Sequence, residues 1–403
     1  MGSRQTLSYD VNGKRRAAFH LIILLGIVSL FGDITYEGAR SITGPYLALL
    51  GASAGIVGLV SGLGEFVGYA FRLVSGYLAD RTQAYWTLTI IGYGLILSIP
   101  LLAFAGQWQL AALLIILERI GKALRTPARD TILSHATKEV GRGWGFGIHE
   151  ALDQIGAVVG PLIFSAVFIL NGGYREGFTI LWIPAILTLA ILFIARREVP
   201  SPEKLEIPDE NEIQNAESNK LPRIFWLYTL FAFLTVAGFA NFQLISYHLN
   251  FRAIVPVTQI PVLYAIAMGV DALVALLIGK AYDKVSLRSL IVIPLFTIPL
   301  PLLAFSHSYA FAVISIMLWG AVMGVHETIM RAAIADITPI ERRGTAYGIF
   351  NTIYGASWFF GGVVMGFLYD FSISYLVIFA IVMEIVSIPV FLSLRKGIRR
   401  AAA

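Results

Sequence analysis

Long apolar segments recur along the whole chain and are separated by short polar connections. A helix that crosses a bilayer needs about 20 mostly apolar residues, and by this measure the sequence contains twelve spans. The expected fold class is therefore an all-α membrane protein with twelve transmembrane helices. The predicted spans cover residues 17–50, 55–79, 86–105, 109–128, 144–170, 178–195, 223–249, 259–281, 289–305, 310–331, 344–369 and 373–394.

One connection differs from the others in length and composition. Residues 196–222 are rich in Pro, Glu and Asn and contain little apolar sequence, which is typical of a solvated linker. This segment divides the twelve spans into two sets of six. We therefore predict an N-terminal six-helix bundle at 1–195, a cytoplasmic linker at 196–222 and a C-terminal six-helix bundle at 223–403.

The two halves share short motifs at a nearly constant offset. The sequence GYLADR at 76–81 follows the second span, and GKAYDK at 279–284 follows the eighth. Arg129, which precedes span five, has its counterpart in Arg331. Such similarity predicts pseudo-symmetric halves that arose by duplication, and halves of this kind place a substrate site near the bilayer midplane between them.

The composition supports a membrane protein and excludes several other classes. Hydrophobic residues make up 57% of the chain and charged residues 14%, which is too little charge to cover a soluble protein of 403 residues. The chain has no cysteine, so disulfides, thiolate metal sites and cysteine nucleophiles are excluded. We expect no metal site and no cofactor.

The net charge of +5 reflects membrane orientation and does not indicate a nucleic-acid partner. Outside the spans, basic residues gather in alternate connections, whereas the intervening loops contain only Arg175 and Arg252. The positive-inside rule therefore predicts cytoplasmic termini in a multi-pass protein of the cell membrane. The first apolar run is too long for a cleaved signal peptide, so we interpret it as a retained span.

The first span contains three charged residues on one helix face. Asp33, Glu37 and Arg40 are spaced i, i+4 and i+7, which places them within roughly 40° of one another around a helix. An ion at this depth costs several kcal/mol unless it is partnered or wet, by estimates that vary widely. We expect these side chains to line a polar cavity that the other helices enclose. The alternative is an internal ion pair between Glu37 and Arg40 that only fixes helix packing.

Twelve spans, a central linker and the repeated Gly-x-x-x-Asp-Arg/Lys motif resemble the major facilitator superfamily. Residues 76–81 match the loop signature G-x-L-x-D-R of this family, although residues 82–85 depart from its usual basic continuation. The resemblance implies its fold of two six-helix bundles. It also implies that this loop holds the cytoplasmic side shut, and the gating residues would be Gly76, Asp80, Arg81, Asp283, Arg129 and Arg331. The alternative for the two aspartates is a solvated turn.

Spans four and five add more specific similarities. Gly156-x-x-x-Gly160-Pro161 resembles the antiporter signature of drug/proton exchangers, and we expect these three residues to shape the helix. The charged run at 118–130 is similar to one found in a branch of bacterial and archaeal permeases. We expect Arg119 to face the cavity, and Lys122, Arg125 and Arg129 to form a basic belt at the interface.

Other polar residues inside the spans are candidates for substrate or proton coupling. Glu65 and Arg72 share a face of span two, and Arg72 could instead neutralise Glu65 or Asp80. His149 and Asp153 are four apart, which suits either a proton relay or a structural hydrogen bond. The complete set of candidates is Asp33, Glu37, Arg40, Glu65, Arg72, Arg119, His149, Glu150, Asp153, Asn241, Asp271 and Asn351.

These features predict a secondary transporter that works by alternating access. Proton-coupled export of small organic or amphipathic molecules is the first interpretation, because buried carboxylates can take up a proton on one side and release it on the other. The alternative is a symporter or uniporter for an anionic metabolite that uses Arg40, Arg72 and Arg119. Catalytic motifs such as HExxH and GxSxG are absent, so we expect no enzyme. Sodium coupling stays open, and a monomer is expected by analogy.

Overall fold

The computed structural model describes residues 11–140, 142–205, 221–338 and 343–401 and contains no strand within them. The helices of the first half are α1 (Val11–Leu49), α2 (Ala54–Thr82), α3 (Tyr85–Gly94), η1 (Leu95–Ser98), η2 (Pro100–Phe104), α4 (Trp108–Val140), α5 (Arg142–Ile169), α6 (Tyr174–Ile180), α7 (Trp182–Glu198) and η3 (Pro202–Leu205). Those of the second half are α8 (Arg223–Ala237), α9 (Phe242–Phe251), α10 (Ile260–Val285), η4 (Ser286–Ile291), α11 (Val292–Thr297), α12 (Pro299–Ala304), α13 (Tyr309–Ile337), α14 (Arg343–Phe371) and α15 (Ile373–Ala401).

The predicted twelve-span α-helical fold is confirmed. Eleven spans among the described residues are long and apolar enough to cross a membrane. The twelfth is α4, which is long enough at 33 residues but contains more charge. Because its charged side chains point into the protein, as shown below, the helix can still cross lipid.

The seventh span, predicted over 223–249, is present over Arg223–Phe251, but it is not one continuous helix. It is broken between α8 and α9, where the Asn241 side chain accepts a hydrogen bond from Leu244 N at 2.8 Å and begins the second helix. Trp319 Nε1 donates to Ala240 O at 3.0 Å and satisfies the backbone of the break. A broken helix is tolerated at membrane depth when its backbone is buried in protein, as it is here.

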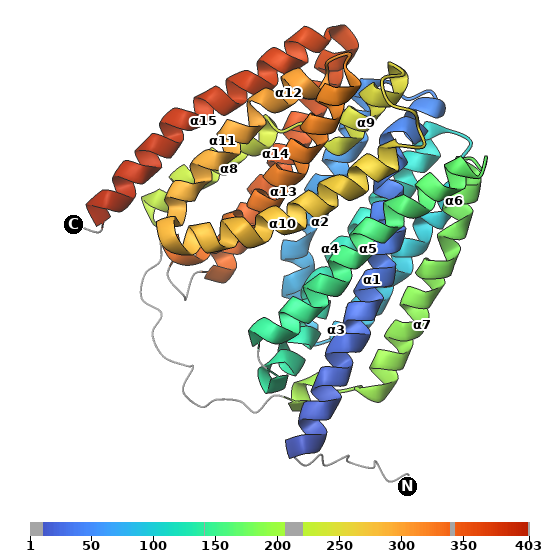
Figure 1. Ribbon diagram of the computed structural model, residues 1–403. Helices are drawn as coiled ribbons and strands as arrows, with labels where there is room; N and C mark the ends of the chain where they lie inside the picture. The colour runs from blue at the N-terminus through green and yellow to red at the C-terminus, as the bar shows by residue number, and fades with distance from the viewer. Residues whose placement is uncertain (1–10, 141, 206–220, 339–342, 402–403) are drawn as a thin grey trace.

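The helices form two groups that lean against each other (Figure 1). Helices α1–α7 lie on one side and α8–α15 on the other, and the start of α1 and the end of α15 lie at the same end of the molecule. The two groups diverge toward that end, which we call the terminal end. They approach each other through α2 with α14, α1 with α9 and α5 with α10.

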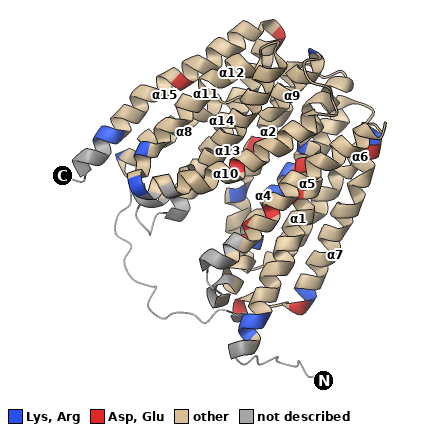
Figure 2. Cartoon of the chain, viewed as in Figure 1, with Lys and Arg blue, Asp and Glu red and all other residues tan. Residues whose placement is uncertain are grey.

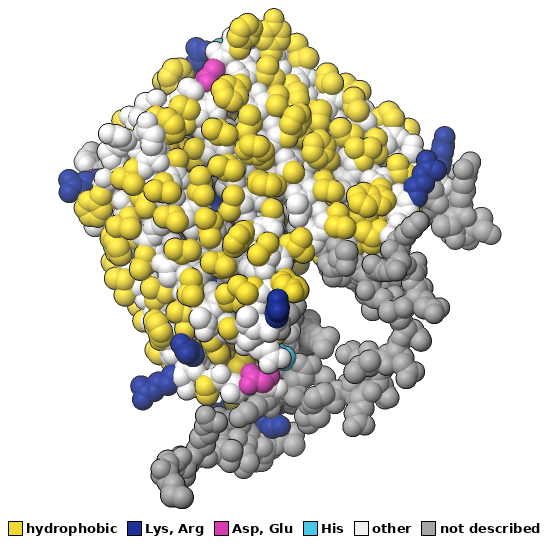
Figure 3. Space-filling view, turned by 180° about the vertical axis from the view of Figure 1, so that it is seen from behind, with side chains coloured by type: hydrophobic (Ala, Val, Ile, Leu, Met, Phe, Trp, Pro, Cys, Tyr) yellow, Lys and Arg dark blue, Asp and Glu magenta, His cyan; other side chains and the backbone are white. Residues whose placement is uncertain are grey.

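The outer surface of the protein suits a lipid environment. Large apolar side chains such as Leu276 and Leu295, which are 71% and 64% exposed, cover the outside of the helices. The space-filling view shows this apolar surface over most of one face, with lysines and arginines near its margins (Figure 3). Many charged residues lie at helix ends, and others lie between the two halves (Figure 2).

Small residues allow α2 and α14 to pack closely. A Cβ atom on Gly58 would lie 2.2 Å from Gly362 O, and one on Gly366 would lie 2.7 Å from Ala54 O. Small residues at such positions let helix backbones approach each other in membrane proteins. The packing of α2 on α14 is the most extensive contact between the two halves.

We expect Gly58→Ala to lower the thermal stability of the purified protein in detergent by several degrees. The added methyl group would collide with the backbone of α14, which cannot move without separating the two halves. Gly68→Ala is the matched control on the same helix, because a Cβ there meets nothing within 4 Å. Alanine raises helix propensity by about 1 kcal/mol, so the control should be neutral or slightly stabilised. Equal melting temperatures for the two variants would contradict the close packing of α2 on α14.

The end opposite the termini, which we call the closed end, is held by polar contacts between the halves. Asp370 at the end of α14 accepts hydrogen bonds from Ala54 N at 3.0 Å and Gly55 N at 2.7 Å. These amides begin α2, where the helix dipole favours a carboxylate. Ser165 Oγ on α5 also donates to Thr258 O at 2.6 Å.

Candidate functional site

A cavity of about 210 Å³ lies between the two halves. It is bordered by α1–α5 from the first half and by α10 and α13 from the second. Twelve of the nineteen described residues that line it are charged. The lining consists of Asp33, Glu37, Arg40, Tyr69, Arg72, Tyr93, Lys122, Arg125, Thr126, Arg129, Asp130, Glu150, Asp153, Gln154, Ala157, Met268, Asp271, Met323 and Glu327.

The cavity lies between mid-depth and the terminal end. Glu150 and Asp153 are in the first half of α5, Glu327 is in the second half of α13, and Asp33 is near the middle of α1. Since successive spans run in opposite directions, all of these positions lie either at the middle of the bundle or between its middle and the terminal end. The closed end lies beyond them, so the cavity faces the side to which the halves diverge in Figure 1.

A buried ion-pair network connects α1, α2 and α4. Arg40 contacts Glu37 at 3.5 Å and Glu65 at 3.2 Å, and Arg119 contacts Glu65 at 2.9 Å. These side chains are at most 12% exposed. Tyr264 on α10 donates to Glu37 Oε2 at 2.5 Å, which extends the network into the second half. The predicted pair of Glu37 and Arg40 is therefore present, but it is part of a larger network.

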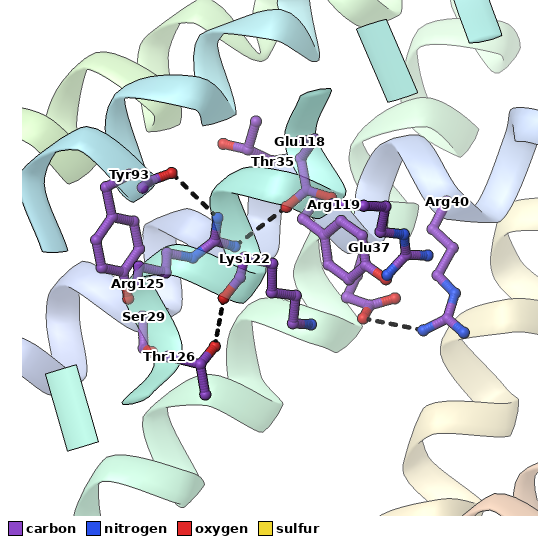
Figure 4. A network of polar contacts seen from close by, with 12 residues as sticks. Ser29, Thr35, Glu37, Arg40, Tyr93, Glu118, Arg119, Lys122, Arg125 and Thr126 are labelled. Carbon is purple, nitrogen blue, oxygen red and sulfur yellow. Dashed lines mark hydrogen bonds and ion pairs between the residues drawn. The ribbon is translucent and has the colours of Figure 1, made fainter. Parts of the chain in front are cut away.

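The basic residues of α4 line the cavity, and the expectation of a belt at the interface is wrong for Lys122, Arg125 and Arg129. The Lys122 ammonium lies 4.1 Å from the centroid of the Tyr36 ring. Arg125 contacts Glu118 at 3.1 Å (Figure 4). Their i, i+3, i+7 spacing places all three on one helix face, which the tertiary structure turns inward.

Arg129 forms its own set of contacts in the cavity. Its guanidinium contacts Asp130 at 2.8 Å and donates to Ser29 Oγ at 2.9 Å. The structure thus places Arg129 among the cavity residues, whereas the sequence assigned it to a gate.

Several acidic residues of the cavity lack a cationic partner at contact distance. Asp33, Asp153 and Asp271 form no hydrogen bond or ion pair within the part of the chain that the structure describes. Asp33 lies close enough to Asp153 for the two carboxylates to repel each other, and Lys122 and Arg125 attract Asp33 from α4. The charges of Glu327, Glu37 and Glu150 repel that of Asp271 more strongly than Arg40 attracts it.

Other predicted site residues lie outside the cavity lining. Arg119 and Glu65 are in the ion-pair network, and Asn241 caps α9. His149 is buried, and its Nε2 atom has no hydrogen-bond partner among the described residues. Asn351 is half-buried on α14 and does not belong to the lining.

The predicted gate is only partly described. Gly76 packs on α4, since a Cβ there would lie 3.7 Å from Pro127 Cβ, and Arg81 is exposed. The side chains of Asp80, Asp283 and Arg331 lie outside the described residues.

Gly156 and Gly160 lie where α5 crosses α1. A Cβ on Gly156 would be 2.4 Å from Leu30 O, and one on Gly160 would be 2.5 Å from Ile34 O. Pro161 follows inside the same helix. The close crossing brings Asp33 and Asp153 to the same cavity.

Sequence reasoning left Tyr36, Tyr264, Lys122, Arg125 and Glu327 out of the site. For Glu327, the signal was available, since it is an acid inside an apolar span. The tyrosines gave no signal, because aromatic residues are common throughout membrane helices. A second cavity of about 310 Å³ lies between α10, η4 and α15, away from these acids.

The comparisons with known proteins agree with this architecture. The family profile described as Major Facilitator Superfamily matches residues 22–294 and 243–402. The chain belongs to the Major Facilitator Superfamily. Like other proteins of this fold, it is a secondary transporter with membrane-spanning helices and a small-molecule substrate.

Relatives and solved structures span nearly the whole chain. An uncharacterized protein of Mycobacterium tuberculosis is 41% identical over 384 residues, which is 94% of each chain. An uncharacterized MFS-type transporter of Methanocaldococcus jannaschii is 28% identical over 91% of this chain and 92% of its own. The crystal structure of a bacterial homologue of the human lysosomal transporter Spinster, in an inward-facing and occupied conformation, has a TM-score of 0.71 at 16% identity and covers 94% of this chain and 96% of that one.

Proposed function

We propose that this member of the superfamily couples the movement of a small charged solute to the movement of protons in the opposite direction. The observation that supports this most is the set of cavity acids that lack an ion pair, Asp33, Asp153 and Asp271. A carboxylate at membrane depth needs a positive partner, and a proton or a cationic group of the substrate can provide it. Competition for the same acids would make exchange obligatory.

The transport cycle follows from the two ends of the molecule. The structure is open toward the terminal end and closed at the other, which is one of the two states that alternating access requires. We propose that the termini are cytoplasmic, as the loop charges predict, in the cell membrane. The described conformation is then the inward-facing one, and the chain acts as a monomer.

The alternative is a symporter or uniporter for an anion. Two of the three arginines that it would use, Arg40 and Arg119, are both in contact with Glu65 and are less able to bind an anionic substrate. The basic residues of α4 are better placed to do so. The acidic surplus of the cavity favours exchange over this alternative.

We expect stabilising ligands to bind less tightly as the pH falls from 8 to 6, because protons compete for the cavity acids. A thermal-shift screen of purified protein with amines, zwitterions and organic anions at both pH values measures this. Asp33→Asn and Asp271→Asn should each weaken the pH dependence, although Glu37, Glu150, Asp153 and Glu327 also face these positions. Ligand binding that is independent of pH in the wild-type protein would refute proton exchange.

Transport itself is tested in proteoliposomes that contain the ligand found in the screen. Under the proposed mechanism, a pH gradient that is acidic outside drives the ligand out of the vesicles. Protons enter in exchange, and a pH-sensitive dye inside the same vesicles measures the resulting acidification. A gradient that instead draws the ligand in would support the symporter.

A further inference from the structure

Eight of the twelve charged residues around the cavity are sorted by wall. The other four are Asp33, Glu37 and Arg40 on α1, which carries both signs, and Asp130 on α4, which pairs with Arg129. The basic wall consists of Arg72 on α2 with Lys122, Arg125 and Arg129 on α4. The acidic wall consists of Glu150 and Asp153 on α5, Asp271 on α10 and Glu327 on α13. The basic wall belongs entirely to the first half, whereas the acidic wall is divided between the two halves.

We propose that the substrate is a small zwitterion whose ammonium group binds the acidic wall and whose acidic group binds the basic wall. This inference rests on the proposed transport function and specifies its cargo. A solute with both charges can complement Asp271 on the acidic wall and Lys122 on the basic wall at once, whereas a simple amine or a simple anion leaves one of these two residues without an ionic partner among the described residues.

The acidic wall needs a cation. Asp271 is 3% exposed and forms no ion pair within the described part of the chain. Its strongest electrostatic neighbours are Glu327 on α13, Glu37 on α1 and Glu150 on α5, and all of them are acids. An ammonium group between α5 and α10 would replace repulsion by charge-assisted hydrogen bonds on both sides.

The basic wall has donors available for an acidic group. The Lys122 ammonium forms no hydrogen bond or ion pair with another described residue and lies against the Tyr36 ring. Arg125 and Arg129 each contact one acid and keep further N–H groups, because a guanidinium has five donors. A carboxylate or phosphate near Lys122 would use these donors.

The size and lining of the cavity favour a small, polar solute. Its volume of about 210 Å³ is below the 300–1,000 Å³ that is typical of pockets for drug-sized ligands. Only Ala157, Met268 and Met323 contribute wholly apolar side chains among the described lining residues. This argues against the amphipathic cargo expected from the sequence and for a solute of amino-acid or dipeptide size.

The divided acidic wall also connects binding to conformational change. Closing the terminal end brings Glu150 and Asp153 on α5 toward Asp271 and Glu327 in the other half. Of these acids, Asp153 and Asp271 form no ion pair with a described residue, so their carboxylates repel each other as they approach unless positive charge lies between them. An ammonium group of the substrate, or protons in its absence, would therefore permit closure, while an empty cavity would resist it.

A panel matched in charge tests the inference. Amino acids and dipeptides are compared with their N-acetyl derivatives, which lose the positive charge, and their C-terminal amides, which lose the negative charge. The readout is the melting temperature of the full chain in detergent at pH 7. We expect at least one zwitterion to stabilise the protein, and its two derivatives to bind about tenfold more weakly or worse. Equal stabilisation by an amide or N-acetyl derivative, or none by any zwitterion of the panel, would overturn the proposal.

Two variants separate the walls. Lys122→Gln should reduce the preference for the zwitterion over its amide, since one partner of the acidic group is lost, while both ligands still stabilise the protein. A misfolded protein would be stabilised by neither. Asp271→Asn should weaken the binding of the zwitterion but not the binding of its N-acetyl derivative, which carries no positive charge. Lys396→Gln, which changes an exposed lysine of α15 away from the cavity, is the control that should retain the wild-type preference. If binding shows the charge preference but no pH dependence, the zwitterionic substrate is supported and proton coupling is refuted. If binding depends on pH but shows no charge preference, proton coupling is supported and the zwitterionic substrate is refuted.

Discussion

Asp370→Ala should open the closed end of the transporter. The carboxylate of Asp370 accepts hydrogen bonds from Ala54 N and Gly55 N at the start of α2, at 3.0 and 2.7 Å. The other cap of this helix, Ser53 Oγ, accepts from Ile56 N and lies within the first half. Hydrogen bonds to a charged group contribute about 1.5–3 kcal/mol each, and the helix dipole adds to them. Alanine removes all of this attraction between the halves. Because 1.4 kcal/mol changes an equilibrium tenfold, the ratio of closed to open molecules at this end should fall by about tenfold or more.

Distances between spin labels measure this shift directly, because the chain contains no cysteine that would have to be removed. Leu170→Cys with Phe251→Cys reports on the closed end, and both side chains are at least 60% exposed. Thr82→Cys with Val285→Cys reports on the terminal end. In Asp370→Ala, the first distance should lengthen and the second should shorten.

Glu176 provides the matched control for this experiment. Its carboxylate accepts a hydrogen bond from Gly173 N at 2.8 Å and caps α6, but it makes this contact within the first half. Glu176→Ala should therefore lose a similar cap and leave both label distances unchanged. If the two variants give the same distances, Asp370 does not hold the halves together.

Glu65→Gln should destabilise the protein more than any other single substitution in the cavity region. Glu65 contacts Arg40 at 3.2 Å and Arg119 at 2.9 Å, and all three side chains are almost completely buried. Removing the acid from a buried ion pair typically costs 3–5 kcal/mol, because an uncompensated charge is left behind. Here two arginines lose a partner, although Arg40 keeps Glu37 at 3.5 Å.

Denaturation of the purified protein measures the free energy of unfolding, and we expect it to fall by about 3–5 kcal/mol in Glu65→Gln. Glu203→Gln, which changes an exposed acid, should leave it within about 0.5 kcal/mol of the wild type. The double variant Glu65→Gln with Arg119→Gln should be more stable than Glu65→Gln alone, since the buried charge of Arg119, which loses its acidic partner Glu65, is also removed. A loss below about 1 kcal/mol would mean that water or other groups already satisfy the arginines.

Glu384 is buried in the second half without an ion pair. It lies on α15, is 0% exposed, and neither carboxylate oxygen has a hydrogen-bond partner among the described residues. A carboxylate at membrane depth needs a positive partner or a proton. The structure places it beside Gly238 at the break between α8 and α9, where no described cation approaches.

The sequence by itself determined the class of the protein and its most informative helix. Runs of about 20 apolar residues predict membrane spans, because the thickness of the bilayer sets the length of a helix. The placement of Asp33, Glu37 and Arg40 on one face follows from the period of the α-helix alone. Both inferences depend on local geometry, which a sequence records directly.

Which charges share a cavity was decided only by the tertiary structure. From the sequence, Lys122 and Arg125 are assigned to a basic belt at the interface. The helical period orders residues around an axis but does not fix how the helix is rotated. That rotation comes from packing, such as the close contact of α4 with α3, where a Cβ on Gly121 would lie 2.6 Å from Gly92 O. The contact of Asp370 with the start of α2 joins residues 315 and 316 positions apart, and no local pattern predicts it. Side-chain contacts between distant helices depend on the packing of the whole bundle, so they could not be inferred from the sequence.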